Sequence, residues 1–221
     1  MGQQNKLLLK IGTQTLIEKV VETVLKSKIE EVIVVLGHEA IKIQRILRGK
    51  EVKMIKNPLY QLGMTTSIQM GIQAASKESK AYMIVLGDLV HLEVTELNLL
   101  METFYTLIEE KDIQTVENNK EQQEVENLPV EEKVIIEVKS DDSPKLPPSP
   151  IVIPIFEGKQ GNPVIFSHHF REAILQHSNM DGCKSIVEAH PDCVIKIDMP
   201  NNHILKDVDT PEDYSDLIGN T

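Results

Sequence analysis

Two short apolar runs, each ending in a glycine and a polar residue, constrain the fold more than any other feature. They are EVIVVLGH, which ends at Gly37-His38, and AYMIVLGD, which ends at Gly87-Asp88. Continuous apolar runs rich in β-branched residues are typical of strands buried on both faces, as in a parallel sheet. Because parallel strands need crossover connections, usually helices, the chain is expected to belong to the α/β class.

Helical patterns lie between the expected strands. Apolar residues recur with a period of about 3.6 between Thr13 and Lys28. We also expect helices in EAIKIQRILRG, TTSIQMGIQAAS (N-cap Thr65 or Thr66), TELNLLMETFYTLIEE (N-cap Thr95), residues 168–177, SIVEAH and after DVDTPEDY. Further strands are expected in EVKMI, IVIPIF, GNPVIFS and VIKI. This alternation predicts βαβ units and a mostly parallel sheet.

One segment breaks the pattern. At 221 residues the chain suits one domain with an appendage, and residues 112–150 are polar and acidic. Nine acidic residues and three lysines between Glu117 and Asp142 contribute −6 to a net charge of −11. Such a composition buries too little apolar area to offset the entropy of ordering, so we expect a disordered insertion. A short edge strand at KVIIEVK is the alternative.

Charge and composition exclude several classes of protein. A net charge of −11 argues against a nucleic-acid binder, which needs a basic surface. No apolar run approaches the roughly 18 residues of a membrane span, and no secretory signal is recognised. Cys183 and Cys193 form neither a disulfide framework nor a metal-ligand spacing, so a cytoplasmic location is expected.

Polar residues follow the expected strands where ligands bind in open α/β sheets. Gly37-His38, Asn57-Pro58 and Gly87-Asp88 all lie at carboxyl ends of strands. Asp88 is either a turn residue or a Mg²⁺ ligand, since Mg²⁺ takes one or two carboxylates plus substrate phosphates. In DVDTPEDY, helix capping accounts for Thr210-Pro211 but not for Asp207. Asp207 and Asp209 point to the same side of an extended backbone and could complete the metal site.

Two glycine-containing segments have less specific signals. NPLYQLGMTTSIQMG places a turn, a glycine and hydroxyl groups before a helix, which suits either anion binding or ordinary capping. GKQGNPVIFS alone is typical of a hairpin turn. No histidine or cysteine spacing supports zinc, and no GxSxG motif is present.

Six segments taken in order resemble the molybdenum cofactor cytidylyltransferases of the nucleotide-diphospho-sugar transferase superfamily. They are MGQQNKLLLKIGTQTLIEKVVE, VVLGH, NPLYQLGMTTSIQMGI, MIVLGDLV, IVIPIFEGKQGNPVIFS and LKDVDTPEDY, and they span nearly the whole chain except the acidic insertion. The resemblance implies a three-layer α/β/α sandwich with a Rossmann-like sheet, formed by residues 1–221 as one domain. It also implies transfer of CMP from CTP to molybdopterin, with release of pyrophosphate.

The resemblance also implies roles for individual residues. Lys6 would contact the triphosphate, Asp88 would bind Mg²⁺, and Asp207 and Asp209 would complete the metal or substrate site. The remaining residues implied in nucleotide or substrate binding are Gly37, His38, Asn57, Gly63, Met64 and Ser67, with Gly161, Asn162 and Pro163 in the loop over the acceptor.

The chain departs from the family pattern in two places. Gly87-Asp88-Leu89-Val90 stands where the family has Gly-Asp-Gln-Pro. The family also begins with a buried strand and a loop of the form LAAGxSxRMG, of which Met1-Gly2 matches only the end. Relative to the family, we expect the middle strand of the sheet and the triphosphate loop to be missing.

Two further functions remain open at this stage. One is an enzyme that uses GTP, as a molybdenum cofactor guanylyltransferase does, or that uses another acceptor. The other is a non-catalytic module that binds the pterin or an apo-molybdenum hydroxylase, with the acidic insertion as its partner surface. Titration with CTP and GTP in the presence of Mg²⁺ distinguishes the enzyme from the module.

Deleting residues 117–142 should leave the melting temperature nearly unchanged, because a segment of this composition makes few core contacts. Differential scanning calorimetry of the two proteins checks this expectation. A large fall in melting temperature would instead support a strand at KVIIEVK.

Overall fold

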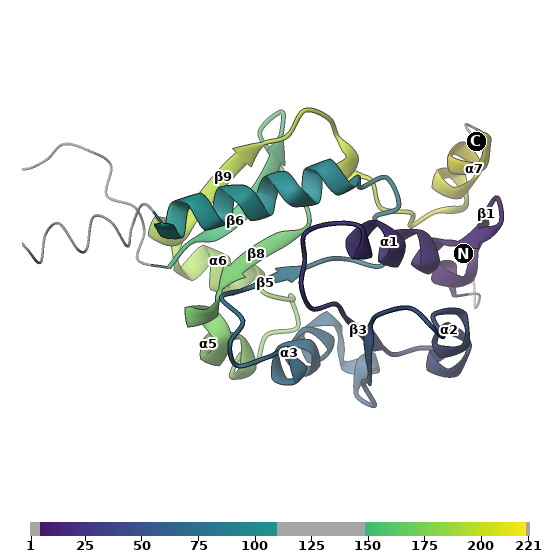
Figure 1. Cartoon of the computed structure of the whole chain (residues 1–221), viewed down its shortest axis with the longest axis horizontal. Helices are drawn as coiled ribbons and strands as arrows, with labels where there is room; N and C mark the ends of the chain where they lie inside the picture. Colours follow the sequence, from purple (N-terminus) through teal and green to yellow (C-terminus); the bar gives the residue numbers. More distant parts are fainter. Residues whose placement is uncertain (1–4, 110–148, 220–221) are drawn as a thin grey trace, which may run out of the picture.

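The computed structural model describes residues 5–109 and 149–219 (Figure 1). The strands are β1 Lys10–Ile11, β2 Gln14–Thr15, β3 Ile33–Leu36, β4 Lys53–Lys56, β5 Ala81–Ile84, β6 Ile151–Phe156, β7 Lys159–Gln160, β8 Val164–Ser167 and β9 Val194–Asp198. The α-helices are α1 Leu16–Leu25, α2 Ala40–Ile46, α3 Met64–Ala74, a helix without a label over residues 94–109, α5 Arg171–Leu175, α6 Lys184–Ala189 and α7 Pro211–Gly219. The 3₁₀ turns are η1 Lys6–Leu8, η2 Tyr60–Leu62, η3 His168–Phe170, η4 Pro191–Cys193 and η5 His203–Leu205.

The strands form two sheets and a small β1–β2 hairpin. β3 and β4 pair in parallel, with Val34 opposite Met54. The larger sheet has the order β5-β8-β6-β7, and β9 also pairs with β6. β8 is antiparallel to β5 and β6, whereas β9 is parallel to β6, so β5, β6 and β9 run in one direction. The predicted α/β class is confirmed, with a mixed sheet in which most strands share a direction.

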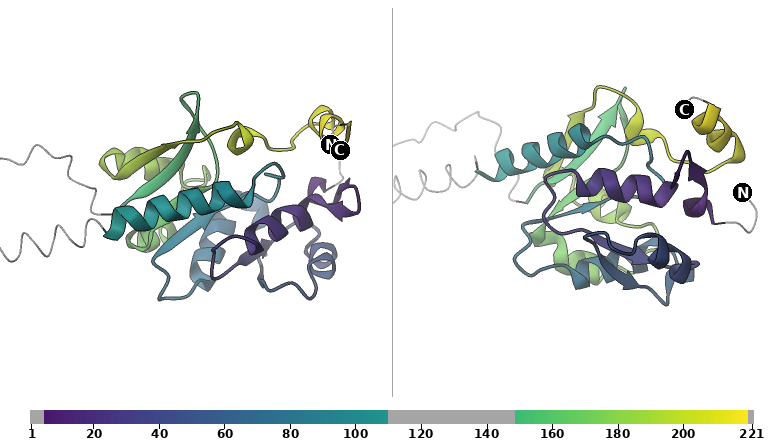
Figure 2. Two further views of the ribbon diagram at one scale, coloured as in Figure 1. Left: turned by 45° about the horizontal axis from the view of Figure 1, so that its top comes forward. Right: turned by 45° about the vertical axis from the view of Figure 1, so that its right-hand side comes forward.

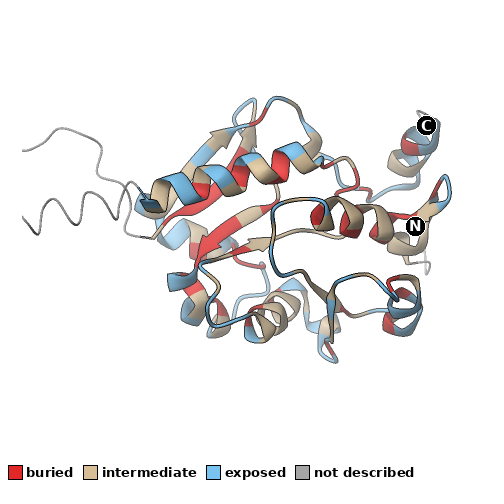
Figure 3. Cartoon of the chain, viewed as in Figure 1, coloured by how far each residue is buried: buried red, intermediate tan, exposed pale blue. Residues whose placement is uncertain are grey.

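Helices cover both faces of the larger sheet and make the structure three-layered (Figures 1 and 3). Val152 of β6 packs with Val24 of α1 and with apolar residues of the helix over 94–109. Its neighbours Ile151 and Ile153 pack on the opposite face with residues from α3, α5 and α6. This alternation follows from the two-residue period of a strand, and it explains why IVIPIF is apolar at consecutive positions.

A capping box fixes the start of α1. The Thr15 side chain accepts a hydrogen bond from the Glu18 backbone N–H at 3.4 Å, and Glu18 Oε2 accepts one from the Thr15 N–H at 2.8 Å. Two of the N–H groups that a helix leaves unpaired at its start are thereby satisfied. α1 is therefore shorter than the periodic segment from Thr13 to Lys28, and the buried residues of its apolar stripe are Leu16, Ile17, Val20, Val21 and Val24.

In the part of the chain that the structure describes, no strand pairing joins the two sheets. Within the described residues, β3 pairs only with β4, and β5 pairs only with β8. Most apolar residues of these edges are half-buried, namely Ile33, Val34 and Val35 on β3 and Met83 and Ile84 on β5, whereas Leu36 and Tyr82 are buried. The equivalent residues Ile151–Ile153 of β6 are buried. Each edge therefore leaves backbone groups without a partner strand, as an edge strand does.

Two helices join the sheets by side-chain packing. Ile17 and Val21 of α1 pack with Leu36 of β3, whereas Val24, one turn further on, belongs to the cluster that includes Met83 of β5. On the other face, α3 contacts β3 through Gly71, where a Cβ would lie 3.4 Å from Val35 Cγ2, and it packs Ile72 against Tyr82 of β5. The relative position of the two sheets is thus set by hydrophobic contacts.

The first and last described elements lie at the same end of the molecule (Figure 2). The hydroxyl of Tyr214 in α7 donates a hydrogen bond to the Lys10 carbonyl oxygen at 2.7 Å. Leu217 of α7 packs in the same cluster as Ile11 and Leu16. The segment that contains DVDTPEDY is thereby held beside the N-terminal elements.

Some predictions fall outside the described residues. The acidic segment of residues 112–150 does so for all but its last two residues, and KVIIEVK lies wholly outside them. Cys183 and Cys193 are both free thiols. In the described ranges, no helix combines the length and apolar character that crossing a membrane requires.

A strand added on the N-terminal side of η1 should stabilise the protein. We expect a β-branched strand followed by a glycine-containing loop to raise the melting temperature by about 5 °C or more, since about 1 kcal/mol corresponds to 2–4 °C at this size. The reason is that it would pair with both open edges and bury their half-exposed side chains. A Gly/Ser extension of equal length is the control in calorimetry, and equal melting temperatures would contradict the expectation.

Candidate functional site

Lys6, Asp88 and Asp209 meet although they lie far apart in the sequence. The Lys6 Nζ is 2.6 Å from Asp88 Oδ2, and it also donates a short hydrogen bond to Asp209 Oδ1. Lys6 belongs to η1, Asp88 follows β5, and Asp209 precedes α7. The structure therefore brings together three of the four residues predicted for the charged part of the site.

A glycine allows the close approach of these elements. A Cβ at Gly87 would lie 3.3 Å from Ile17 Cδ1 and 3.4 Å from Leu7 Cδ2. Asn5 holds the other side of η1, because its side chain accepts a hydrogen bond from the Leu7 N–H at 3.1 Å and donates one to the His38 carbonyl at 3.2 Å. η1 and Lys6 are thereby placed between the ends of β3 and β5.

The electrostatics of the group follow from these contacts. Burial acts to lower the pKa of Lys6, but the hydrogen bonds and charges of Asp209 and Asp88 outweigh it, and the pKa is raised. The hydrogen bond from Lys6 lowers the pKa of Asp209. Burial raises the pKa of Asp207, and the nearby charges of Asp209 and Asp88 raise it further. The charges of Asp88 and Asp209 thus affect the pKa of Asp207, so all three carboxylates belong to one electrostatic group.

These residues fit a divalent cation. Asp88 Oδ1 is buried and has no hydrogen-bond partner among the described residues, so one carboxylate oxygen remains available. Asp88 and Asp209 already share one positive partner, the Lys6 ammonium. In the described ranges no three His, Cys, Asp or Glu side chains form a complete ligand group. The arrangement suits a hard cation such as Mg²⁺ that takes the rest of its oxygen ligands from substrate and water.

Asn57 organises the turn before α3. This side chain is 1% exposed, and its Nδ2 donates hydrogen bonds of 2.9 Å to Thr66 Oγ1 and to Ser67 Oγ. Its Oδ1 accepts a hydrogen bond from the Leu59 N–H at 2.8 Å. Asn57 therefore has a structural role, and the Ser67 hydroxyl predicted to bind substrate is an acceptor for it.

The predicted N-cap of α3 was wrong. The helix begins at Met64 after Gly63, which has a φ of 110°, and no side chain caps it. Thr65 is instead buried, so its hydroxyl is directed away from the cap position into a tertiary contact. The uncapped N–H groups at the start of this 11-residue helix keep the capacity to bind an anion.

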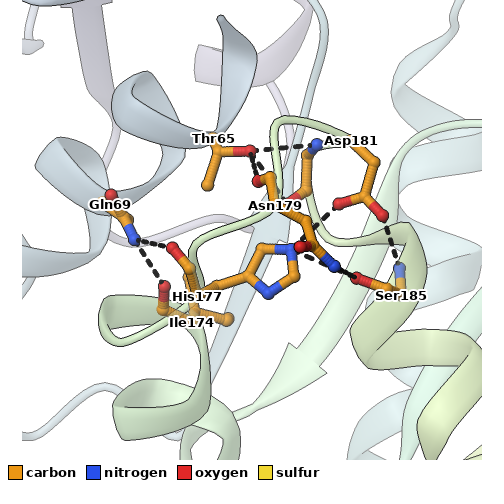
Figure 4. A network of polar contacts seen from close by, with 8 residues as sticks. Thr65, Gln69, Ile174, His177, Asn179, Asp181 and Ser185 are labelled. Atoms are coloured by element: carbon orange, nitrogen blue, oxygen red, sulfur yellow. Dashed lines mark hydrogen bonds and ion pairs between the residues drawn. The ribbon is translucent and has the colours of Figure 1, made fainter. Parts of the chain in front are cut away.

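A polar network holds residues 177–185 against α3 (Figure 4). The Thr65 hydroxyl donates to the Asn179 carbonyl at 2.6 Å and accepts from the Gly182 N–H at 3.1 Å. The Gln69 amide donates to the carbonyls of Ile174, Leu175 and His177. His177 Nε2 lies 2.9 Å from Asp181 Oδ1 and 3.3 Å from Ser185 Oγ. Because both partners contact the same ring nitrogen, this is not the arrangement of a Ser-His-Asp triad.

The network places two methionines against two glycines. A Cβ on Gly63 would lie 3.7 Å from Met180, and a Cβ on Gly182 would lie 2.6 Å from Met64 Cε. Both methionines remain exposed, at 46% for Met64 and 57% for Met180. Gly63 and Met64 were predicted from the sequence, whereas Met180 was not, since only the fold brings the two segments together.

The predicted acceptor loop is attached to the segment that leads to Asp207. The Asn162 N–H donates to the Ile204 carbonyl oxygen at 3.0 Å, and Gly161 approaches so closely that a Cβ there would lie 2.5 Å from the same oxygen. The Asn162–Pro163 peptide bond is cis. The predicted hairpin turn lies just before this loop, where β7 pairs with β6.

Gly37 and His38 pack against η2. A Cβ at Gly37 would lie 2.7 Å from Tyr60 Cβ, and the rings of His38 and Tyr60 are 6.2 Å apart. Through Asn5 the same loop also contacts η1. The site residues thus fall into a charged group around Lys6 and a second group at the start of α3, and the Gly37-His38 loop contacts the segments of both.

Comparison with known proteins identifies the family and the fold. The family described as "MobA-like NTP transferase domain" matches residues 1–194. No curated protein matches the chain. Rv0371c from Mycobacterium tuberculosis H37Rv is 13% identical, with 98% of this chain and 90% of that chain covered and a TM-score of 0.71. Another structure of Rv0371c is a complex with manganese, also 13% identical, with 98% and 93% covered and a TM-score of 0.68.

Two further solved structures share the fold. The nucleotidyl transferase Mth528 from Methanothermobacter thermautotroptrophicus is 16% identical, with 97% of this chain and 84% of that chain covered and a TM-score of 0.67. A CMP:2-keto-3-deoxy-manno-octonic acid synthetase complexed with CTP is 11% identical, with 97% and 90% covered and a TM-score of 0.60. At such identities these likenesses establish the fold alone.

Replacing Thr65 by Val should destabilise the protein by about 1–3 kcal/mol, because it leaves the buried Gly182 N–H and the Asn179 carbonyl without their partner. Thr106→Val is the matched control, since that hydroxyl is exposed and donates only to the Glu102 carbonyl of its own helix. Urea unfolding measures both. Equal losses in the two variants would show that the Thr65 contacts contribute little.

Proposed function

The chain belongs to the MobA-like NTP transferase family, and on this premise we propose that it transfers CMP from CTP to the terminal phosphate of molybdopterin. An oxygen of that phosphate attacks the α-phosphorus of CTP. The bond from the α-phosphorus to the bridging oxygen breaks, and pyrophosphate leaves. We place this reaction in the cytoplasm, in keeping with the two free cysteines.

The contact of Lys6 with Asp88 and Asp209 is the observation that carries the proposal. Nucleotidyl transfer depends on positioning and on neutralising charge more than on covalent catalysis. In our proposal Asp88 and Asp209, with Asp207 beside them, hold Mg²⁺ or Mn²⁺. When bound, the cation would neutralise negative charge on the α-phosphate and on the departing pyrophosphate. The manganese complex of Rv0371c supports a divalent metal in this fold.

Lys6 has two roles in this proposal. In the structure its ammonium group holds the two carboxylates together and offsets their repulsion. Because its side chain is 28% exposed, the ammonium is also accessible to a triphosphate that enters from solvent. The side chain could then exchange its carboxylate partners for phosphate oxygens, which leaves the carboxylates free for the metal.

The start of α3 is the proposed acceptor or nucleotide side. Its uncapped N–H groups suit a phosphate, and Met64 and Met180 provide exposed apolar surface beside them. The loop of Gly161, Asn162 and Pro163 is the proposed cover of the acceptor. CTP is the proposed nucleotide, and GTP is the alternative that a titration of each nucleotide with Mg²⁺ separates.

One observation favours a second function, a module that binds the pterin or an apo-molybdenum hydroxylase without transferring a nucleotide. Leu89 and Val90, which stand in place of the family's Gln and Pro, are 2% and 1% exposed. They are core residues and present no polar group to a substrate. Absence of CTP and GTP binding by calorimetry, together with retained pterin binding, would support this module.

Replacing Asp88 by Asn should lower the rate of pyrophosphate release by more than tenfold, a change worth about 1.4 kcal/mol. Asn keeps the shape of the side chain but removes the charge that holds the cation. The control is Asp192→Asn, which changes an exposed carboxylate in η4. A loss below tenfold in Asp88→Asn would exclude Asp88 as the metal ligand.

A further inference from the structure

Glu96 is the one charged residue that is buried in the described part of the chain, with 3% of its surface exposed. Burying an ionised carboxylate is costly unless it is paired and hydrogen-bonded. Its Oε2 accepts a hydrogen bond of 2.7 Å from the Glu93 N–H, which satisfies a donor at the start of the helix over 94–109. Within the described residues Oε1 accepts no hydrogen bond. The Glu93 N–H is the one local donor to this carboxylate among those residues, so any further partner must come from elsewhere in the fold.

His203 is that partner, 107 residues away in the sequence. Its Nδ1 forms a hydrogen bond of 3.3 Å with Glu96 Oε2 and lies at ion-pair distance, also 3.3 Å, from Oε1. We assign the donor role to Nδ1, since Oε2 is the acceptor for the Glu93 N–H as well. On its other side the His203 ring stacks on His91, with 6.1 Å between ring centroids and 27° between planes. Two elements thus fix the orientation of the His203 ring.

His91 provides a stacking surface for the His203 ring and carries little positive charge. Burial lowers its pKa, and the charges of Lys206, His203 and Lys19 lower it further. At neutral pH the His91 ring is accordingly neutral. His203 is therefore the ring that contacts the Glu96 carboxylate, and His91 only stacks on it.

His203 begins η5, the turn that leads from β9 toward Asp207. The turn is internally ordered, since the His203 N–H donates to Asn201 Oδ1 at 2.9 Å and the Lys206 N–H donates to the His203 carbonyl at 3.1 Å. The next residue, Ile204, is 1% exposed. Any shift of His203 therefore moves the whole turn.

The same turn holds two parts of the proposed site. The Ile204 carbonyl binds the Asn162 N–H and contacts Gly161, so it supports the proposed acceptor loop. Residues 207–209 follow directly, and the middle one, Val208, is anchored in the core at 1% exposed. With Ile204 and Val208 both buried, the turn sets where Asp207 and Asp209 lie.

We infer that Glu96 is a positioning residue, which acts through His203 Nδ1 to align Asp207 and Asp209 with Asp88 and Lys6. It does not touch the reacting groups. This inference rests on the proposed function, because it assumes that these carboxylates hold the divalent cation. Loss of a group that orients metal ligands commonly costs 10–100-fold in metal affinity, and we expect the lower end because Glu96 acts on the ligands through His203 and the turn.

Two replacements of His203 separate positioning from chemistry. The amide nitrogen of Asn can take the place of Nδ1, whereas that of Gln corresponds to Nε2. We expect His203→Asn to bind Mn²⁺ in the presence of CTP within about twofold of the unmodified protein, and His203→Gln to bind it about tenfold more weakly. Isothermal calorimetry gives both affinities, and His190→Gln, at an exposed histidine, is the matched control.

Glu96→Gln provides a second test should His203→Gln fail to fold. Gln keeps the shape of the side chain but replaces the charged carboxylate beside His203 Nδ1 with a neutral amide, so the contact that orients the ring is weakened and we again expect about tenfold weaker Mn²⁺ binding. The inference is overturned if His203→Gln or Glu96→Gln binds Mn²⁺ as the unmodified protein does. It is also overturned if Asn and Gln at position 203 weaken binding equally. Failure of the unmodified protein to bind Mn²⁺ with CTP would instead overturn the proposed function, and this inference with it.

Discussion

Packing of α1 and α3 across two unconnected sheets is the constraint on which the remaining structure depends. In a continuous sheet, backbone hydrogen bonds fix the register and separation of neighbouring strands. Between β3 and β5 that role falls to side chains such as Ile17, Val24 and Ile72. Hydrophobic contacts are strong in sum but not directional, so they permit small shifts that a hydrogen-bonded ladder would resist. Lys6 and Asp88 lie on elements that this packing holds together, and the geometry of the charged group depends on it.

Local polar contacts compensate for that loose constraint near the site. Asn5 links η1 to the loop after β3, Thr65 links α3 to residues 179–182, and the Ile204 carbonyl links two loops. Each contact is directional and satisfies a backbone group that would otherwise lack a partner. Charge is also compensated locally. The Lys6 ammonium group contacts both Asp88 and Asp209 and offsets the repulsion between their carboxylates. Hydrogen bonds and ion pairs thus order the site, whereas apolar burial orders the two sheets and the helices that cover them.

Much of this fold could be predicted from periodicity, and the site only in part. The stripe from Leu16 to Val24 and the runs that became β3, β5 and β6 are local patterns, and the structure has each of them. Asp88 could be identified from its place at a strand end. The N-cap of α3 could not, because a positive φ at Gly63 starts the helix and the Thr65 hydroxyl finds a tertiary partner. The pairing of Glu96 with His203 could not be predicted from any local sequence pattern, since the two residues are 107 positions apart.

Met64 and Met180, which pack against Gly182 and Gly63, make this site sensitive to oxidation. Met64 and Met180 are both accessible to solvent, and Met64 packs closely on Gly182, where a Cβ would lie 2.6 Å from its Cε. Oxidation would convert either thioether to a larger, polar sulfoxide. At Met64 the added oxygen would have to be accommodated next to the close contact with Gly182. Oxidation of Met64 would therefore weaken the packing of the start of α3 on Gly182, and a methionine sulfoxide reductase would reverse the change.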